Sequence, residues 1–252
     1  MADTYLDTFE ARGDLYNEAA LIARSARSVE RQLMLDLLSI ERHHTVVDAP
    51  AGGGYLADGV RELVDADSQV ICVEPSPKFS TAIRASYVRH VSPLDALPIP
   101  DGFADRVGSL AGLHHLGDKS AFFGEAFRVL KTGGLFGVAD VLDGTPAAFF
   151  LNGPVDRYTT TGHRGLFLQT GECETLLATA GFSDVWEVHR SFYWTFSSTE
   201  QLVKYCKSLF GLVKATEEQV AEAVASHFAV ECTGDAVKLP WSLVYAAGCK
   251  RS

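Results

Sequence analysis

The stretch Thr45-Val-Val-Asp-Ala-Pro-Ala-Gly-Gly-Gly54 is the part of the sequence that decides the fold. Its β-branched start predicts a short buried strand, and its three glycines predict a tight turn. Leu56, Val60 and Val64 then recur at helical spacing. A strand that leads through glycines into a helix lets backbone amides approach a ligand without intervening side chains. The stretch therefore predicts a ligand site at the end of a strand in a parallel sheet.

Further strands are expected along the chain. Runs typical of strands lie at 69–74, 87–91, 104–110, 135–140, 185–195 and 241–248. Helix-compatible segments separate them, and Phe79, Ile83 and Tyr87 predict a helix between the second and third strands. Residues 172–180 predict a helix that ends at Gly181. We expect an α/β Rossmann-like fold, with seven strands, mostly parallel, and helices on both faces.

Helical segments flank this core. Apolar residues at 29, 33, 37 and 40 mark one helix face in an N-terminal segment that we expect to pack over the ligand cleft. Two capping-box patterns, Ser198-x-x-Gln201 and Thr216-x-x-Gln219, predict a helical insertion between strands six and seven.

No repeat or Pro/Ser-rich linker divides the chain, so we expect one domain over residues 1–252. Its parts are a helical lid (1–42), a cofactor-binding core (43–141) and a region (142–252) with the substrate-side loop, the helical insertion and the last strands.

The composition limits the classes of partner. Among 252 residues, 22 Lys and Arg stand against 32 Asp and Glu, and the net charge of −10 opposes binding to nucleic acids and anionic membranes. The five cysteines form no Cys-x-x-Cys pair, which fits reduced thiols in the cytoplasm. No apolar stretch reaches membrane-spanning length. We expect a cytoplasmic protein that acts on a small molecule. The sequence does not indicate an oligomeric state.

Two cofactor classes fit the glycine turn. Gly52-x-Gly54-x-x-Ala57, with Glu74 about 20 residues onward, also matches the relaxed dinucleotide fingerprint of NAD(P)-dependent oxidoreductases. Asp48 separates the two interpretations, because dinucleotide sites seldom need a carboxylate just before the turn. A ligand with a cationic amino group could use one.

The run Val46-Val-Asp-Ala-Pro-Ala-Gly-Gly-Gly54 resembles the first motif of class I S-adenosylmethionine-dependent methyltransferases. The resemblance implies that Asp48 lies beside the methionine moiety and that Gly52 and Gly54 permit the close turn. It also implies that Glu74 binds the ribose hydroxyls. Pro50 departs from the family pattern, which has a glycine there, and predicts a tighter turn.

The resemblance continues for about a hundred residues. Residues 94–101 are similar to the segment in which an acid, here Asp95, and the following amide, here of Ala96, contact adenine. Residues 103–116 are similar to the fourth strand and its cofactor-facing end, which includes Ala111. The implied function is methyl transfer by in-line displacement, with S-adenosylhomocysteine as product. A non-catalytic or repurposed member of the same fold is a further alternative.

Histidines are the candidate catalytic groups. Adjacent residues such as His114 and His115 point in different directions, and no further ligand lies at suitable spacing, so no metal site is expected. We expect His115 to line the active site and His114 to pack. His163, in a long loop, is a second candidate base or substrate contact, and Asp140 a third. Aromatic residues in the region after 141 are expected to pack the core, and some to wall an apolar substrate pocket: Phe149, Phe150, Tyr158, Phe167, Phe192, Tyr193 and Trp194.

Overall fold

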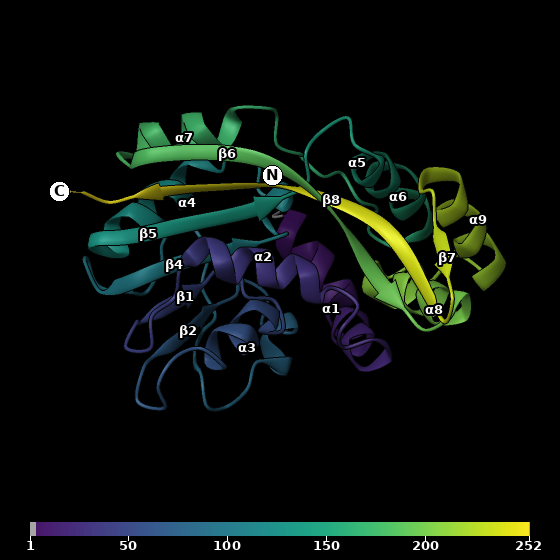
Figure 1. The fold of residues 1–252 in the computed structure, drawn as a ribbon, viewed down its shortest axis with the longest axis horizontal. Helices are drawn as coiled ribbons and strands as arrows, with labels where there is room; N and C mark the ends of the chain where they lie inside the picture. Colours follow the sequence, from purple (N-terminus) through teal and green to yellow (C-terminus); the bar gives the residue numbers. More distant parts are fainter. Residues whose placement is uncertain (1–3, 252) are drawn as a thin grey trace.

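An 8-stranded mixed sheet runs through the protein in the computed structural model, which describes residues 4–251 (Figure 1). The strands are β1 (Val46–Asp48), β2 (Val70–Val73), β3 (Val88–His90), β4 (Ala104–Leu110), β5 (Leu130–Asp140), β6 (Ser183–Phe196), β7 (Glu231–Thr233) and β8 (Ala236–Cys249). Their order is β3-β2-β1-β4-β5-β8-β6, and β7 pairs with β8 outside this path. Strands β1 to β5 pair in parallel, whereas β8 is antiparallel to both neighbours. The predicted Rossmann-like fold is confirmed.

Helices cover both faces of the sheet. They are α1 (Thr4–Ile22), α2 (Ser28–Leu38), α3 (Tyr55–Arg61), α4 (Ser120–Val129), α5 (Pro146–Phe150), α6 (Asp156–Tyr158), α7 (Glu172–Ala180), α8 (Thr199–Leu209) and α9 (Glu217–His227), with short turns η1 (Phe79–Ala82), η2 (Leu113–His115) and η3 (Leu151–Val155). Helices α2 and α3 lie on one face, and α4 and α7 on the other (Figure 1). None of the helices in residues 4–251 has both the length and the apolar character to cross a bilayer.

The two faces of β1 enter two separate cores. Val46 packs in the cluster that contains Met34 of α2, whereas Val47 packs in the cluster that contains Phe122 and Phe136. All three residues of β1 are therefore buried, which explains why this strand is an unbroken apolar run up to Asp48. The cleft opens where the chain order reverses, since β1 has β2 on one side and β4 on the other.

Two helix predictions were wrong in detail. The segment with Phe79, Ile83 and Tyr87 forms only η1, and Ile83 already has an extended backbone. The spacing of these side chains reflects separate contacts with the core, not one helix face. In α2 the buried face is rotated away from the predicted one, and Val29 is 45% exposed.

The rotation of the buried face of α2 has an electrostatic cause. Glu30 is fully buried, where it pairs with Arg27 and accepts a 2.9 Å hydrogen bond from the Trp194 indole. Because an unpaired buried carboxylate would be costly, these partners fix which side of α2 faces inward.

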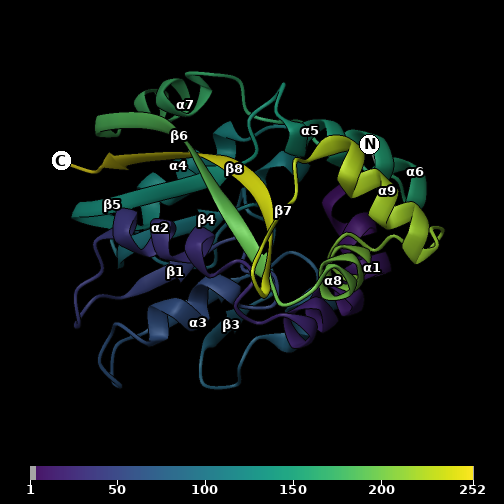
Figure 2. The same ribbon diagram turned by 45° about the vertical axis from the view of Figure 1, so that its right-hand side comes forward.

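The helical insertion between β6 and β8 is confirmed. Ser198 caps α8, and Thr216 begins α9 with a complete capping box. These helices lie beside α1 and α5, beyond the end of the main sheet (Figure 2). Strand β7, which the sequence did not predict, is a three-residue strand that pairs with the start of β8.

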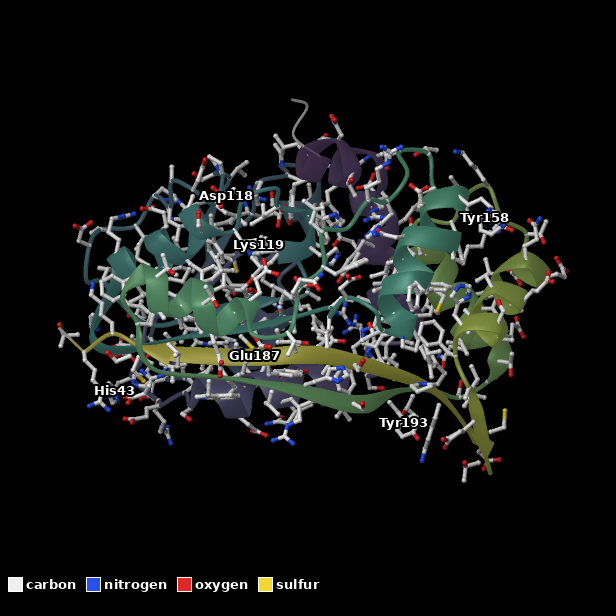
Figure 3. All side chains as sticks on the ribbon, turned by 90° about the horizontal axis from the view of Figure 1, so that it is seen from above. His43, Asp118, Lys119, Tyr158, Glu187 and Tyr193 are labelled. Carbon is white, nitrogen blue, oxygen red and sulfur yellow. The ribbon has the colours of Figure 1, made fainter. Side chains whose placement is uncertain are left out.

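Strands β6 and β8 extend past the sheet as a two-stranded arm. Strand β5 pairs with β8 only as far as Asp140 and Val244, whereas β6 follows β8 to the pair Phe196 and Val237. At the other end of β6, Glu187 accepts hydrogen bonds from the amides of Gly171 and Cys173 and so caps α7 (Figure 3). The arm carries side chains from the sheet into the helical insertion.

Candidate functional site

The glycine turn has the backbone that its sequence predicts. Gly52 and Gly54 have φ values of +54° and +89°, in the left-handed region that favours glycine. A Cβ at Gly53 would lie 2.4 Å from the Asn17 Oδ1 atom of α1. The turn closes with a 2.8 Å hydrogen bond from the Gly54 amide to the Ala51 carbonyl. Pro50, preceded by a cis peptide bond, lies against Gly112.

Asp48 is buried directly beneath this turn. Its Oδ2 accepts a 3.0 Å hydrogen bond from the Ala57 amide, so it caps the first turn of α3. Burial raises the pKa of Asp48 to about 8, against the effect of the Ala57 hydrogen bond and with a contribution from the nearby Glu74 charge. Asp48, Gly52 and Ala111 line one cavity of about 40 Å³. The cavity brings together three of the residues expected to bind cofactor.

Glu74 is fully buried at the end of β2 and accepts three hydrogen bonds. Its Oε2 accepts from the Tyr5 hydroxyl and from the Gly52 amide, both at 2.8 Å, and its Oε1 accepts from the Ser76 amide at 2.9 Å. Burial raises the pKa of Glu74 to about 7, although these hydrogen bonds act in the opposite direction. The carboxylate expected to hold a ribose thus holds a hydroxyl of α1.

Helix α1 enters the cleft with aromatic side chains. Phe9 stacks on Phe79, with ring centroids 4.6 Å apart, and Phe79 lies over Gly52. The sequence predicts an N-terminal helical cover, but not that its side chains fill the ligand space. The cavity at Asp48, of about 40 Å³, is far below the roughly 300–1,000 Å³ of most ligand sites, whereas a neighbouring cavity of about 400 Å³ borders the same turn at Gly53 and Tyr55. A ligand with a ribose-like diol fits Glu74 chemically once Tyr5 and Phe9 withdraw.

Asp95 and Ala96 lie away from this cavity. Both are exposed in the loop after β3, and neither lines the cavities at the glycine turn or at the histidines. Their contact with adenine stays a prediction. Ala111, by contrast, has a φ of +56° and lies at the boundary of both cavities.

Three histidines converge on a second cavity, of about 60 Å³. His114 and His115 come from η2, after β4, and His163 comes from the loop that follows α6. His114 Nδ1 lies 2.6 Å from Asp140 Oδ1. An ionised carboxylate only accepts, so Nδ1 carries the hydrogen, and in the neutral ring Nε2 is the basic atom.

Asp140 is held as the charged partner of His114. Burial alone would raise the pKa of Asp140, but the His114 charge and hydrogen bonds from His114 and from the amides of Val141 and Leu113 outweigh it. The pKa of Asp140 therefore lies below its ordinary value. The arrangement has the form of a histidine base oriented by a buried acid.

The tautomer of His163 follows from Asn152. The Asn152 Oδ1 atom accepts from the Gly165 amide at 2.7 Å, and its Nδ2 atom donates to the Gly165 carbonyl at 3.0 Å. The same Oδ1 lies 3.1 Å from His163 Nδ1, which must then be the donor. Burial, followed by the charges of His114 and Arg12, lowers the pKa of His163 well below its usual value. His163 is therefore neutral at pH 7.

His115 is also neutral at pH 7. Burial and the charges of His114, His163 and Arg12 lower its pKa well below the usual value. The structure thus brings both predicted histidines, His115 and His163, to one cavity. His114, which was expected to pack, also lines that cavity. Neighbouring parallel strands end at the same sheet edge, so the ends of β4 and β5 could have indicated the pairing of His114 with Asp140.

The three histidines also have a spacing compatible with a metal ion. One ring nitrogen from each lies within 4.8 Å of the others. No local pattern indicated this cluster, because His163 reaches the pair from a distant loop.

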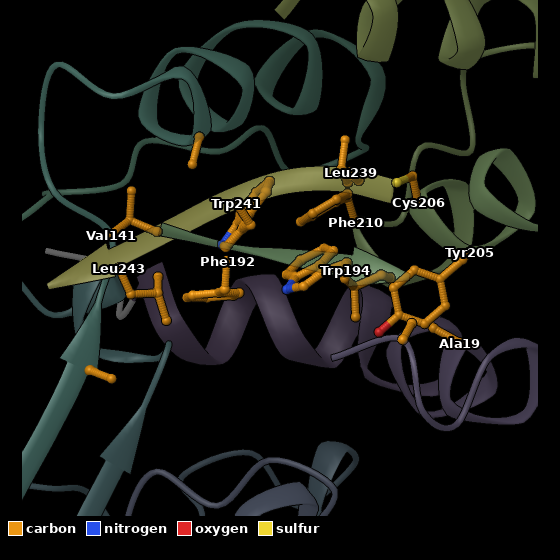
Figure 4. Close-up of a cluster of buried hydrophobic side chains, with 14 of the residues drawn as sticks. Ala19, Val141, Phe192, Trp194, Tyr205, Cys206, Phe210, Leu239, Trp241 and Leu243 are labelled. Carbon is orange, nitrogen blue, oxygen red and sulfur yellow. The ribbon is translucent and has the colours of Figure 1, made fainter. Parts of the chain in front are cut away.

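Aromatic rings form the far wall of the histidine cavity. Trp194 and Trp241 stack with centroids 4.3 Å apart, and Phe210 lies 6.3 Å from Trp194 and 6.0 Å from Trp241 (Figure 4). Both tryptophans come from the β6–β8 arm. Of the seven aromatic residues predicted to pack the core, with some of them walling a pocket, Trp194 is buried and lines this cavity, whereas Phe149 is 61% exposed.

Comparisons with known proteins agree with this fold and turn. A family model described as a methyltransferase domain matches residues 47–138. A "probable S-adenosylmethionine-dependent methyltransferase" of Mycolicibacterium smegmatis is 33% identical over 141 residues, which cover 54% of this chain and 51% of the relative. The chain thus spans about half the length of that curated relative.

Solved structures share the fold across most of the chain. A "possible histamine N-methyltransferase" from Thermotoga maritima has a TM-score of 0.66 at 20% identity, with 98% of this chain and 99% of that chain covered. Geranyl diphosphate C-methyltransferase from Streptomyces coelicolor has a TM-score of 0.55 at 17% identity, with 89% and 79% covered.

Proposed function

Residues 47–138 form a class I S-adenosylmethionine-dependent methyltransferase domain, and on that premise we propose that this protein methylates a small-molecule acceptor. The observation that carries the proposal is the adjacency of two cavities. The cavity at the glycine turn and the cavity lined by His114 share Phe9, Tyr16, Arg27 and Ala111 as lining residues. A cofactor in the first would face an acceptor in the second.

The cofactor would be held by Gly52, Asp48 and Glu74. The Gly52 turn admits close backbone approach, Asp48 would lie by the amino group, and Glu74 would exchange the Tyr5 hydroxyl for ribose. When bound, S-adenosylmethionine supplies a methyl carbon that an acceptor lone pair attacks in line, while the carbon–sulfur electron pair leaves with sulfur. Binding requires the first turns of α1 to move away from Phe79.

His114 would act as the general base. Its Nε2 takes the proton from the acceptor's O–H or N–H, while Asp140 holds Nδ1 and stabilises the imidazolium that forms. His163 and His115, neutral in the same cavity, would orient the acceptor. The aromatic wall would help to exclude water from this region.

The whole chain would work as one domain. Residues 1–42 would form a lid, residues 43–141 would bind cofactor, and residues 142–252 would supply the acceptor side. We further propose that nucleic acids and membranes are not partners, in keeping with the net charge of −10. The five unpaired cysteines favour the cytoplasm as its location.

Calorimetry with S-adenosylhomocysteine tests the proposal. We expect saturable binding that Glu74→Gln weakens about tenfold, and no binding of NAD. Binding of NAD alone would instead favour an oxidoreductase. A metabolite extract incubated with protein and S-adenosylmethionine should then yield a product heavier by one methyl group in mass spectrometry. Cofactor binding without any methylated product would indicate a repurposed member of the fold.

A further inference from the structure

Arg12 of α1 gives the histidine cavity an unmatched positive charge. We propose that Arg12 is an anion-binding subsite and that the acceptor carries a carboxylate or phosphate group on an apolar body. That the bound anion is the methyl acceptor rests on the proposed function, whereas anion binding at Arg12 does not.

The guanidinium of Arg12 is buried without a counter-ion. The residue is 7% exposed and lines the cavity, and its Nε has no hydrogen-bond partner. Within residues 4–251, its one hydrogen bond runs from Nη1 to the Phe210 carbonyl at 3.3 Å, and no carboxylate pairs with it. Arg27, equally buried and on the same cavity, is neutralised by Glu30. The contrast singles out Arg12 as the buried cation that has no carboxylate partner, with the Phe9 ring 5.3 Å from its guanidinium carbon as its aromatic contact.

Arg12 keeps its charge in spite of burial. Burial lowers the pKa of Arg12 to about 10, with the hydroxyl groups of Tyr16 and Tyr5 acting the other way, so it is protonated at pH 7. A buried charge without a counter-ion is strongly destabilising. An anion that enters from solvent would supply the missing partner, and the planar guanidinium can bind a carboxylate or phosphate through two parallel hydrogen bonds.

The cavity as a whole favours an anion over a cation. Its described lining contains Arg12, Arg27 and three histidines, and no carboxylate. The Arg12 charge is among the causes that lower the pKa of both His115 and His163, in keeping with its place on the same cavity. The same field would repel a metal ion at the histidines.

The remaining walls determine the rest of the ligand. The stacked rings of Trp194, Phe210 and Trp241 offer an apolar surface beside Arg12. The cavity, at about 60 Å³, has room for an acid group and a few carbons. Movement of Phe9 would enlarge this cavity towards the cofactor cavity. An acid group at Arg12 and a proton-bearing nucleophile near His114 would be two ends of one ligand.

Matched probes test the subsite. Titration calorimetry would measure benzoate, benzamide and phenyl phosphate with the full chain at pH 7.5, with and without saturating S-adenosylhomocysteine. Benzoate or phenyl phosphate should bind at least tenfold more tightly than benzamide, whose shape is the same but whose charge is absent. The better of the two anions assigns the subsite to carboxylates or to phosphate esters.

Variants separate the subsite from a structural role. Arg12→Gln should abolish the preference for anions, Arg12→Lys should keep part of it, and the exposed Arg157→Gln should keep all of it. Wild type but not Arg12→Gln should gain thermal stability from benzoate or phenyl phosphate. Affinity for S-adenosylhomocysteine should change less than twofold.

Several results would overturn the inference. They are equal affinity for benzoate and benzamide, an unchanged anion preference in Arg12→Gln, or loss of S-adenosylhomocysteine binding in that variant, which would assign Arg12 to the cofactor's carboxylate. Zinc chloride binding that His163→Ala removes, without any anion binding, would assign the cavity to a metal. If anions bind but S-adenosylhomocysteine does not, the proposed function fails and the subsite remains.

Discussion

Replacing Tyr5 by phenylalanine should tighten cofactor binding. The Tyr5 hydroxyl donates a 2.8 Å hydrogen bond to buried Glu74, whose pKa of about 7 leaves it ionised at pH 8. A hydrogen bond to a charged group contributes about 1.5–3 kcal/mol. The bond exists only while α1 fills the cleft, so its loss destabilises the closed state and leaves the cofactor-bound state unchanged. At about 1.4 kcal/mol per factor of ten, the lower limit corresponds to roughly tenfold tighter binding.

Calorimetry of S-adenosylhomocysteine at pH 8 would measure this change. Tyr87→Phe is the matched control, because Tyr87 donates a comparable 2.7 Å hydrogen bond to Asp58, outside the cofactor cavity. That variant should keep the wild-type affinity. Tyr5→Phe should also unfold at lower temperature than wild type in the absence of ligand, with the difference vanishing at saturation. Unchanged or weaker binding by Tyr5→Phe would refute the competition between Tyr5 and the cofactor.

Three other changes have defined outcomes. Gly52→Ala should lower the free energy of unfolding by about 1–3 kcal/mol in urea, because φ is +54° and the new Cβ would lie 2.7 Å from the Phe79 ring; Gly133→Ala, strained in backbone but open in space, should cost less. The free energy of unfolding should fall by about 2 kcal/mol between pH 6.5 and 8. The pKa values of Asp48 (about 8) and Glu74 (about 7) are raised, so the folded state holds protons that the unfolded state has released. Asp48→Asn should remove most of this pH dependence, and an equal pH dependence in the variant would contradict its assignment to Asp48. Asp140→Asn should lower the free energy of unfolding by about 2–4 kcal/mol and shift the His114 ring tautomer in ¹⁵N NMR. A wild-type His114 that is already protonated at Nε2 alone would rule out His114 as a base oriented by Asp140.

The sequence was sufficient for the features that depend on local rules. The strand before Asp48, the left-handed glycines and the Thr216 cap all follow from short-range sterics and hydrogen bonding. Adjacency in a doubly wound sheet then brings Asp48 and Glu74 to one edge. The convergence of these two carboxylates at one sheet edge was therefore predictable from the strand pattern, whereas their roles followed from the family resemblance.

Other features depend on contacts between distant segments. Arg12 has no local motif that would mark it as buried, since its environment is made by Phe210 and the histidine loop. The entry of Tyr5 into the cleft depends on where α1 packs against α8 and η1. The helical spacing of Phe79, Ile83 and Tyr87 was misleading, because a loop that touches the core at three points can imitate a helix face.

The β6–β8 arm places one wall of the histidine cavity beyond the main sheet. Its seven residue pairs beyond the sheet extend roughly 20 Å and carry Trp194 and Trp241 to the far wall of the cavity. No strand of the cofactor half pairs with this part of the arm. On the proposed function, substitutions there would reshape the acceptor cavity without breaking a strand pair of the cofactor half, so the arm is where we expect new substrate preferences to evolve or be grafted.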